Sequence, residues 1–389
     1  MGSEMCIRDR PVSMQISSKR SENELAMPNL NLPPGTLIID PESPKPVLTV
    51  FGYSPESFEE RTLQHPDEVK EFMQKWPLIW LNVDGLGDEA TLRSIAQIFN
   101  IHPLALEDIA DTSQRAKVEQ YDGHATFIVV PMPHPVEHQH EFTTEQLCLY
   151  LGERCVVSFQ ETAPGDCLEV IRNRIRQKKG RVRISNAAYL AYALVDTVID
   201  AFFPIVSNMG DSLDALEARI MEESKNSQIF DIRAVKVNLM RVRRAVWPMR
   251  DAILNMTTME HVWGQDLRPY LRDAADHVAR LMDLIETDRM MASDLMELYL
   301  NSASNRLGEV NKFLTVVATI FIPVGAIASI YGMNFDMEKS AWNMPELKWT
   351  YGYPFALGLM TTVAAIFLFI FWRRGWLGNQ FDGHKRKRK

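Results

Sequence analysis

The sequence predicts an α/β domain that is followed by long helices and then by two membrane-spanning helices. Three observations carry this prediction. Strand-like segments alternate with helical segments between residues 46 and 184, and from residue 185 strand signals give way to apolar residues at every third or fourth position. Near the C-terminal end, two apolar runs over 313–331 and 351–372 hold no charged residue.

The composition narrows the classes of function. The chain has 389 residues, enough for two or three domains, and its net charge of −8 argues against nucleic acid as a partner. The four cysteines show neither a CxxC pair nor zinc-site spacing, which indicates reduced thiols. Residues 1–30 are polar and lack the apolar core of a signal peptide, so we expect a disordered leader over 1–45 and a domain that stays on the side of synthesis.

The α/β domain is expected over 46–184. β-Branched and aromatic residues with turn residues at their ends predict strands over 47–53, 78–85, 125–132, 144–151 and 154–161. Gly152 and Glu153 join the last two segments as a hairpin, and helices are expected over 88–99, 103–110 and 166–178. The sequence contains no P-loop, no GxGxxG after a strand, no HExxH and no GxSxG, so we do not expect an enzyme.

A helical stalk is expected over 185–312. Its last stretch starts near Pro269 and continues to Tyr331, a rod of about sixty residues that would be roughly 90 Å long. Such a rod cannot bury itself within one small domain, so we expect copies of the chain to associate. Acidic residues outnumber basic ones between Asp273 and Glu309. Either a solvated helix face or an electronegative funnel that concentrates cations accounts for this excess.

The two apolar runs predict spans over 313–332 and 351–372, because a helix needs about 20 predominantly apolar residues to cross a bilayer. The alternative is a pair of buried helices in a soluble core. Aromatic residues, which gather at membrane interfaces, favour the spans. They stand at both ends of the second run: Trp349, Tyr351, Tyr353, Trp372 and Trp376.

The segments beside the spans predict the orientation. The tail over 373–389 is rich in Lys and Arg, and the positive-inside rule places it in the cytoplasm, where it can also contact anionic lipid. Two spans return the chain to its starting side. We therefore expect both termini in the cytoplasm and the loop over 333–350 outside a cytoplasmic (inner) membrane.

One face of the first span is less bulky and more polar than the rest. A stripe at helical spacing leads toward the loop: Asn311, Leu314, Ala318, Ile322, Gly325 and Ser329. Small residues in a membrane helix also promote helix packing, but we interpret this stripe as a pore lining because it leads to Asn334. Mg²⁺ gives up its water reluctantly, so neutral amide and carbonyl oxygens at a pore mouth would hold the hydrated ion without trapping it.

Three short segments resemble the signature of the CorA family of magnesium transport proteins: YGMNF (331–335), MPEL (344–347) and YGYP (351–354). Similarity extends upstream through 304–323 and, more weakly, through HPLALEDI (102–109) and QRAKVE (114–119). The resemblance implies a funnel-shaped homopentamer whose first spans line the pore. It also implies that Gly332, Met333 and Asn334 form the filter for hydrated Mg²⁺.

The resemblance further implies that Mg²⁺ is a regulator as well as the transported ion. Cytoplasmic Mg²⁺ would be sensed between subunits by Asp108 and Asp273. Glu107 with Asp196 or Asp200 would form a second site. Bare carboxylates repel one another across such an interface, and Mg²⁺ would bridge them and hold the closed state.

Two departures from the family pattern affect the pore. Gly308 and Gly325 stand where the family often has asparagine and threonine, so Leu314 and Ile322 remain the candidates for a gate that closes by dewetting. A zinc or other transition-metal transporter on the same scaffold is the alternative, and Co²⁺ or Ni²⁺ are possible lesser substrates. Three histidines in HPVEHQHEF could bind a soft metal or form a polar hairpin tip: His134, His138 and His140.

Overall fold

The structure is a computed structural model that describes residues 33–121, 125–135, 142–162, 165–222, 225–334 and 342–376. Contacts divide the chain into two compact units. The first comprises residues 1–213 and 233–291, and the second comprises 214–232 and 292–389. Outside the described residues lie His138, His140, residues 335–341 of the loop between the predicted spans and residues 377–389 of the basic tail.

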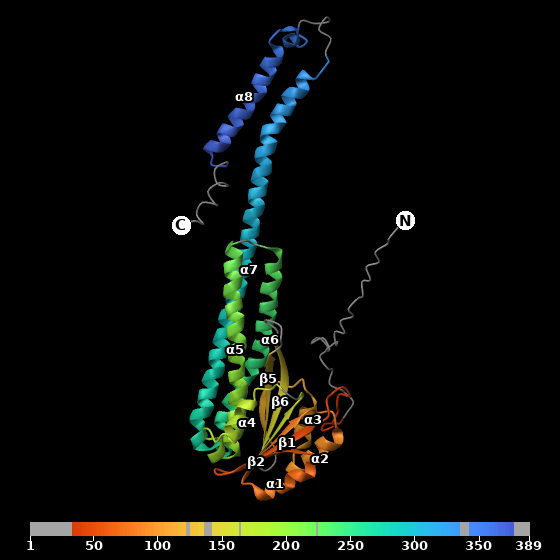
Figure 1. Cartoon of the computed structure of the whole chain (residues 1–389), viewed down its shortest axis with the longest axis vertical. Helices are drawn as coiled ribbons and strands as arrows, with labels where there is room; N and C mark the ends of the chain where they lie inside the picture. Colours follow the sequence, from red (N-terminus) through yellow and green to blue (C-terminus); the bar gives the residue numbers. More distant parts are fainter. Residues whose placement is uncertain are drawn as a thin grey trace, which may run out of the picture. The chain divides into compact units, whose positions relative to one another are not determined.

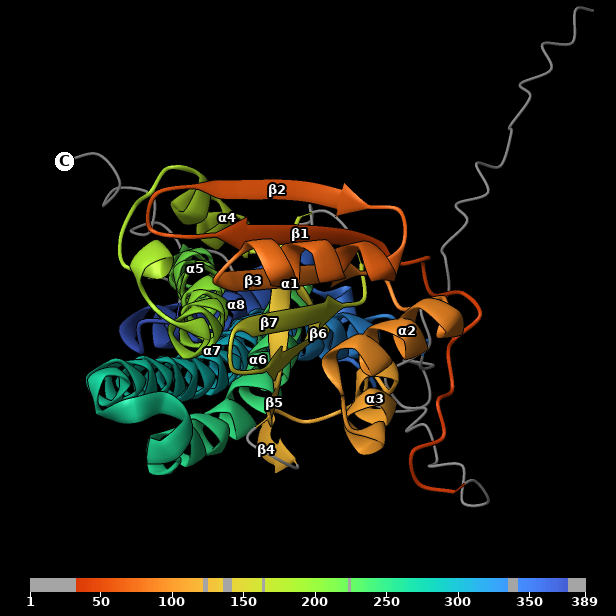
Figure 2. The same ribbon diagram turned by 90° about the horizontal axis from the view of Figure 1, so that it is seen from below.

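Seven strands form one mixed sheet in the first unit, in the order β2-β1-β3-β7-β6-β5-β4, which Figure 2 shows from β2 to β4. The strands are β1 (Val47–Tyr53), β2 (Phe58–Leu63), β3 (Leu78–Asp84), β4 (Lys117–Tyr121), β5 (Ala125–Pro135), β6 (Phe142–Leu151) and β7 (Cys155–Gln160). Of the pairs within the described residues, β3 with β7 is parallel and the others are antiparallel. The β6–β7 hairpin predicted at Gly152 is confirmed.

One face of the sheet packs against three short helices, α1 (Val69–Lys75), α2 (Glu89–Phe99) and α3 (Pro103–Ala110). Alternate strand residues such as Val50, Leu81 and Val157 join helix residues such as Ile95 and Ile109 in one buried cluster. Asp88 accepts a hydrogen bond from the Thr91 N–H and so caps α2. This packing fixes the position of α3, which carries Glu107 and Asp108.

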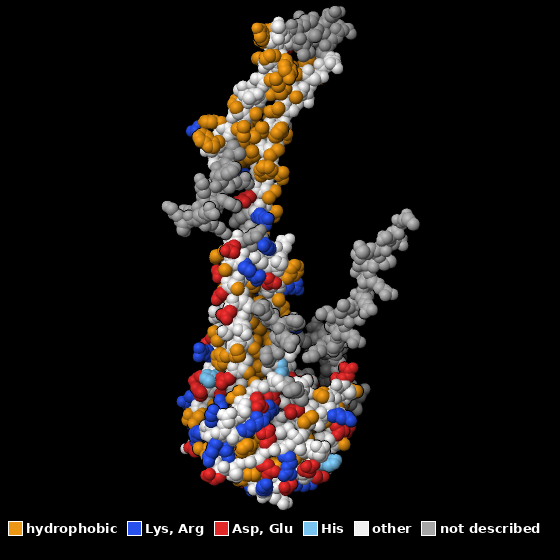
Figure 3. Space-filling model, viewed as in Figure 1, with side chains coloured by type: hydrophobic (Ala, Val, Ile, Leu, Met, Phe, Trp, Pro, Cys, Tyr) orange, Lys and Arg blue, Asp and Glu red, His pale blue; other side chains and the backbone are white. Residues whose placement is uncertain are grey.

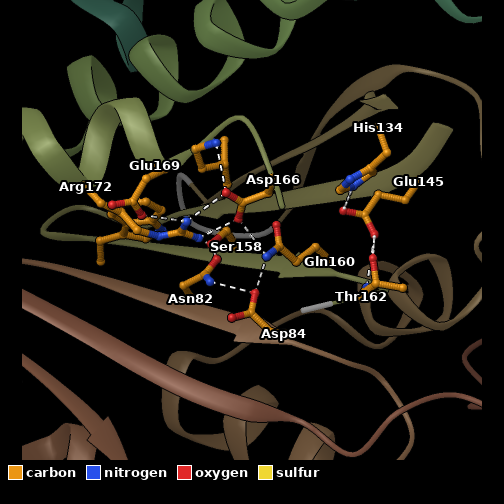
Figure 4. Close-up of polar contacts among 12 residues, drawn as sticks. Asn82, Asp84, His134, Glu145, Ser158, Gln160, Thr162, Asp166, Glu169 and Arg172 are labelled. Atoms are coloured by element: carbon orange, nitrogen blue, oxygen red, sulfur yellow. Dashed lines mark hydrogen bonds and ion pairs between the residues drawn. The ribbon is translucent and has the colours of Figure 1, made fainter. Parts of the chain in front are cut away.

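The opposite face of the sheet carries a buried polar network (Figure 4). Trp80 donates to Ser158 at 2.8 Å, and Ser158 donates to Asn82 at 2.6 Å, which ties the parallel strands β3 and β7 together. The network continues through Gln160 to Asp166, whose carboxylate accepts two hydrogen bonds from Arg172 of α4 (Glu169–Arg176). Arg172 also lies over the Trp80 ring, so α4 is held against this face by charge and by packing.

Three elements of this domain were absent from the sequence prediction: β2, β4 and α1. Both strands lie at the edges of the sheet, and their sequences FEERTL and KVEQY are mostly polar, so the apolar signal of a strand is weak. The predicted leader is also too long. Leu37 is buried in the core cluster, and the Gly87 N–H donates to the Pro44 carbonyl, so residues 33–45 are part of the folded domain.

Four long helices make up most of the remaining chain: α5 (Ala187–Glu222), α6 (Asn226–Thr258), α7 (Glu260–Tyr331) and α8 (Gly352–Arg373). Short 3-10 turns cover Pro66–Glu68 (η1), Val182–Ile184 (η3) and Pro345–Lys348 (η4). The helix predicted from Pro269 begins earlier, at Glu260, and is interrupted at Gly264, whose φ of 67° and ψ of 167° are not helical. Glycine tolerates this conformation, so the chain bends there at low cost.

Within the described residues, three helices are long and apolar enough to cross a membrane: α5, α7 and α8. They differ in burial, because 61% of the most apolar stretch of α5 is buried in the structure, against 6% for α7 and 11% for α8. Figure 3 shows apolar side chains covering the surface of α8 and the C-terminal part of α7. Apolar side chains left uncovered on this scale call for a lipid or protein partner.

Candidate pore helix and carboxylate cluster

The tripeptide predicted as a filter lies directly at the end of α7. The Gly332 N–H donates to the Ala328 carbonyl at 2.9 Å, and the Met333 N–H donates to the Ile330 carbonyl at 3.1 Å. These two bonds complete the last helical turn and leave Asn334 exposed just beyond it. The C-terminal end of a helix carries a partial negative charge, so the position of Asn334 favours a cation.

All six residues of the predicted pore stripe are exposed in the single chain. Leu314 and Ile322 have exposed fractions of 57% and 69%, and no atom of another element lies within 4 Å of a Cβ built at Gly308 or Gly325. Nothing in the described part of the second unit covers this face. The absence of a Cβ at the two glycines therefore widens the stripe rather than admitting a neighbouring helix of the same chain.

A different side of α7 is covered. Val316 is buried, and Lys312, one turn earlier on the same side, lies over the ring of Trp376, which follows α8. Successive helix residues turn by about 100°, so Leu314 and Ala318 each lie about 200° from Val316. The predicted pore stripe is thus the side of α7 that faces away from this contact.

Three carboxylates of the predicted sensor and one histidine lie close together between α5 and α7 in the first unit. The imidazole of His277 lies 3.5 Å from Asp200, 3.9 Å from Asp196 and 3.9 Å from Asp273. Each helix contributes a pair four residues apart, Asp196 with Asp200 and Asp273 with His277, and this spacing puts both members on one helix face. We call these four residues the carboxylate cluster.

The carboxylate cluster is electrostatically unfavourable as it stands. Burial and then the charge of Asp200 raise the pKa of Asp196, against the opposing effect of His277. One oxygen of Asp196 and Nδ1 of His277 are buried without a hydrogen-bond partner. Among the described residues no set of three His, Cys, Asp or Glu side chains is arranged to hold a metal ion. On one chain the cluster is therefore rich in charge but incomplete as a coordination site.

Asp108 lies in a different environment. Its carboxylate is 15% exposed and forms an ion pair with Lys117 at 2.8 Å. Burial raises the pKa of Asp108, and Lys117 and its hydrogen bond act in the opposite direction. The neighbouring Glu107 accepts a hydrogen bond from the Gly35 N–H at 2.6 Å. Asp108 is thus partly buried and already neutralised by a cation from its own chain.

The structure brings together some of the predicted sensor residues and leaves others apart. Asp196, Asp200 and Asp273 are neighbours. Among the described residues, no hydrogen bond or ion pair joins Asp108 to Asp273. Sequence reasoning missed His277 and Lys117 as members of these groups. The spacing of His277 four residues after Asp273 could have been recognised in the sequence, because it places both on one helix face. The ion pair of Lys117 with Asp108 depends instead on how β4 is placed relative to α3 in the fold.

His134 is not part of a hairpin tip. It lies in β5 opposite Thr143 of β6, and its imidazole contacts Glu145 (Figure 4). The second Glu145 oxygen accepts hydrogen bonds from the N–H and hydroxyl of Thr162. His134 is therefore engaged within the sheet, and His138 and His140 lie outside the described residues.

Comparisons with known proteins agree on one family. Residues 77–374 match the model of the family described as "CorA-like Mg2+ transporter protein". The chain is 36% identical, over 348 residues, to the cobalt/magnesium transport protein CorA of Thermotoga maritima, and the match covers 89% of this chain and 97% of that relative.

Solved structures show the same fold. The complete CorA magnesium transporter from Methanocaldococcus jannaschii has a TM-score of 0.72 at 22% identity and covers 85% of this chain and 99% of that one. The ZntB cytoplasmic domain from Vibrio parahaemolyticus has a TM-score of 0.53 at 12% identity and covers 67% of this chain and 100% of that one. Both likenesses concern the fold alone.

Proposed function

Because the chain belongs to the CorA-like Mg²⁺ transporter family, we propose that it is a channel that admits hydrated Mg²⁺ across the cytoplasmic membrane. The observation that carries this proposal is the exposed stripe on α7 that leads to Asn334. A face that is uncovered in one chain, small and partly polar, is suited to line a pore between copies. The amide of Asn334 then stands where the pore opens.

The burial of the three apolar helices supports two spans per chain. α5 buries most of its apolar stretch inside the first unit, so α7 and α8 are the helices left to cross the bilayer. With the basic residues after α8 on the inner side, both termini lie in the cytoplasm. We take the oligomer to be a funnel-shaped homopentamer, as the family resemblance implies.

The proposed gate responds to cytoplasmic Mg²⁺. The carboxylate cluster of one subunit would receive Mg²⁺ together with Glu107 and Asp108 of its neighbour, since neither group is a complete site alone. Burial and then the charge of Asp200 raise the pKa of Asp196, and bound Mg²⁺ relieves this repulsion and holds the subunits in the closed state. Loss of Mg²⁺ restores the repulsion, so the subunits separate and the segment beside Leu314 and Ile322 becomes wet.

A zinc or other transition-metal transporter on the same scaffold is the second candidate. The likeness to the ZntB cytoplasmic domain supports it at the level of the fold. The residues at the C-terminal end of α7 favour Mg²⁺. The described segment Gly332 to Asn334 offers amide and carbonyl oxygens rather than the imidazole or thiolate groups that soft metals prefer. Co²⁺, named for the Thermotoga relative, is a plausible lesser substrate.

The test is potential-driven Mg²⁺ uptake into proteoliposomes that contain the full chain. Asn334→Ala should reduce uptake at least about tenfold, the change that 1.4 kcal/mol makes, while the oligomer stays intact. Asn301→Ala is the matched control, since Asn301 is an exposed asparagine on α7 far from its C-terminal end. If Zn²⁺ enters, Mg²⁺ does not, and uptake follows a proton gradient, the zinc transporter is correct.

A further inference from the structure

A basic cavity lies in the first unit, apart from the carboxylate cluster and the pore helix. Its volume is about 270 Å³, and it opens between residues 112–116, strands β5 and β6, and helix α6. Figures 1 and 2 both show α6 beside the β5–β6 region of the sheet. Three arginines line it: Arg115 from the segment before β4, and Arg241 and Arg244 from α6.

The charge of the cavity is opposite to that of the chain. Three arginines and one acidic residue, Glu145, are among the residues that line the cavity, in a protein whose net charge is −8. Glu145 is also engaged elsewhere, because one of its oxygens contacts His134 and the other accepts from Thr162. The hydrogen bond to Glu145 raises the pKa of His134, which favours the imidazolium that offsets this single negative charge.

The α6 side of the cavity is built by helical spacing. Arg241, Arg244, Ala245 and Pro248 follow one another at intervals of three, one and three residues, which places them on one helix face. Ala245 and Pro248 are too short to fill the space between the helix and the sheet. Neither Arg115 nor Arg244 forms an ion pair with any described residue, and both are exposed. Their charges are therefore available to a ligand.

The opposite wall is preorganised. Asp111 accepts hydrogen bonds from the N–H and hydroxyl of Ser113 and from the side-chain amide of Gln114. The Gln114 N–H in turn donates to the side-chain oxygen of Gln146 at 3.0 Å. These contacts hold the segment that carries Arg115 in one conformation, so a ligand would not have to order it.

We propose that this cavity binds a small phosphate-bearing anion. Guanidinium groups match phosphate oxygens in planar, bidentate hydrogen bonds, and the hydroxyls of Thr112 and Thr144 in the lining add further donors. At about 270 Å³ the cavity is slightly smaller than typical ligand pockets of roughly 300–1,000 Å³, which suits one or two phosphate groups rather than a whole nucleotide.

The position of the cavity links it to Asp108, and this consequence rests on the proposed function. The Gln146 side chain, which lines the cavity, also donates to the Asp108 carbonyl at 2.8 Å, and Lys117 follows the lining residue Ala116 directly. An anion held by Arg115 would act on the same short segment that supplies Lys117 to Asp108. Anion binding would therefore shift the Mg²⁺ concentration that closes the channel.

Calorimetry with inorganic pyrophosphate tests the binding site, using the full-length protein in detergent without Mg²⁺. We expect saturable, salt-sensitive binding of one anion per chain. Arg115→Ala and Arg244→Ala should each weaken it at least about tenfold, since each removes a charge-assisted bidentate contact. Arg250→Ala is the matched control, because Arg250 is an exposed arginine on α6 that does not line the cavity.

Either of two calorimetric results would overturn the binding site: no saturable pyrophosphate binding, or binding that Arg250→Ala weakens as much as Arg115→Ala and Arg244→Ala do. A changed oligomeric state in Arg115→Ala and Arg244→Ala would also overturn it, because the cavity would then belong to a contact between subunits. Asn334→Ala, which blocks uptake under the proposed function, should leave pyrophosphate binding unchanged, so the two proposals fail separately. An identical Mg²⁺ dependence of uptake in Arg244→Ala and the unaltered protein would overturn the link to Asp108.

Discussion

The two ends of α7 have opposite relations to the rest of their own chain. Between residues 267 and 285 every third or fourth side chain is buried inside the first unit, including Leu271, Val278 and Leu281. Between residues 311 and 329 the apolar and small side chains of the stripe are exposed. The same helical period thus builds a buried core at one end and an exposed apolar surface at the other. Under the proposed function, other chains and lipid cover the second surface.

The largest expected effect tests this contrast through stability. Leu281→Ala opens a cavity in a fully buried site and should lower the free energy of unfolding by about 2–5 kcal/mol. Leu314→Ala should change it by less than about 0.5 kcal/mol, because Leu314 is exposed. Thermal unfolding of the two full-length variants in detergent measures the difference. Equal losses of stability would show that the stripe is packed rather than pore-lining.

Leu314→Ala should instead affect transport. Under the proposed gating, a smaller side chain would widen the apolar constriction, so water and ions should pass at an internal Mg²⁺ concentration that closes the unaltered protein. Uptake into proteoliposomes loaded with Mg²⁺ measures this leak. Val316→Ala is the control on the other side of the helix, and a leak of the same size in that variant would contradict the assignment of the pore face.

Lys117→Gln tests whether the ion pair of Asp108 competes with Mg²⁺. Removing the cation leaves a partly buried carboxylate without its partner, so Mg²⁺ should bind more tightly. We expect the internal Mg²⁺ concentration that halves uptake to fall about fivefold, which corresponds to roughly 1 kcal/mol. Lys117→Arg keeps the charge and should stay close to the unaltered protein. A higher half-inhibiting concentration in Lys117→Gln would show that the ion pair supports the site instead.

Asp196→Asn should give the smallest effect, and it depends on pH. The pKa of Asp196 is raised in the folded chain, so its contribution to stability is present below the unfolded pKa of about 3.9 and is lost as pH rises through the folded pKa. At pH 7 without Mg²⁺ the asparagine should therefore stabilise the protein by up to about 1 kcal/mol. It should also reduce the stabilisation that Mg²⁺ gives.

Thermal unfolding across pH 4 to 8 measures both effects of Asp196→Asn. Asp200→Asn is the comparison, because its carboxylate is more exposed and should matter less. A loss of stability in Asp196→Asn at pH 7 without Mg²⁺ would contradict this expectation. It would show that favourable contacts stabilise the ionised Asp196 carboxylate in the folded chain.

The sequence by itself determined the features that depend on local pattern. The uncharged runs, the long apolar period of α7 and the β-branched and aromatic segments of β1 and β3 are visible because membrane, helix and strand each favour certain residue types among close neighbours in the sequence. The stripe that leads to Asn334 could be read in the same way. The edge strands β2 and β4 could not, since they are held by pairing with one neighbour and need no apolar repeat.

Only the tertiary structure decided which charges meet. Asp196 and His277 are 81 positions apart in the sequence, and Arg115 and Arg244 are further apart still, so no local repeat relates them. Their distances follow from where α5, α6 and α7 pack against the sheet and against each other within the first unit. Apolar burial sets those positions, and the charged side chains acquire their partners as a consequence, because electrostatic interactions between distant segments exist only once packing has brought them together.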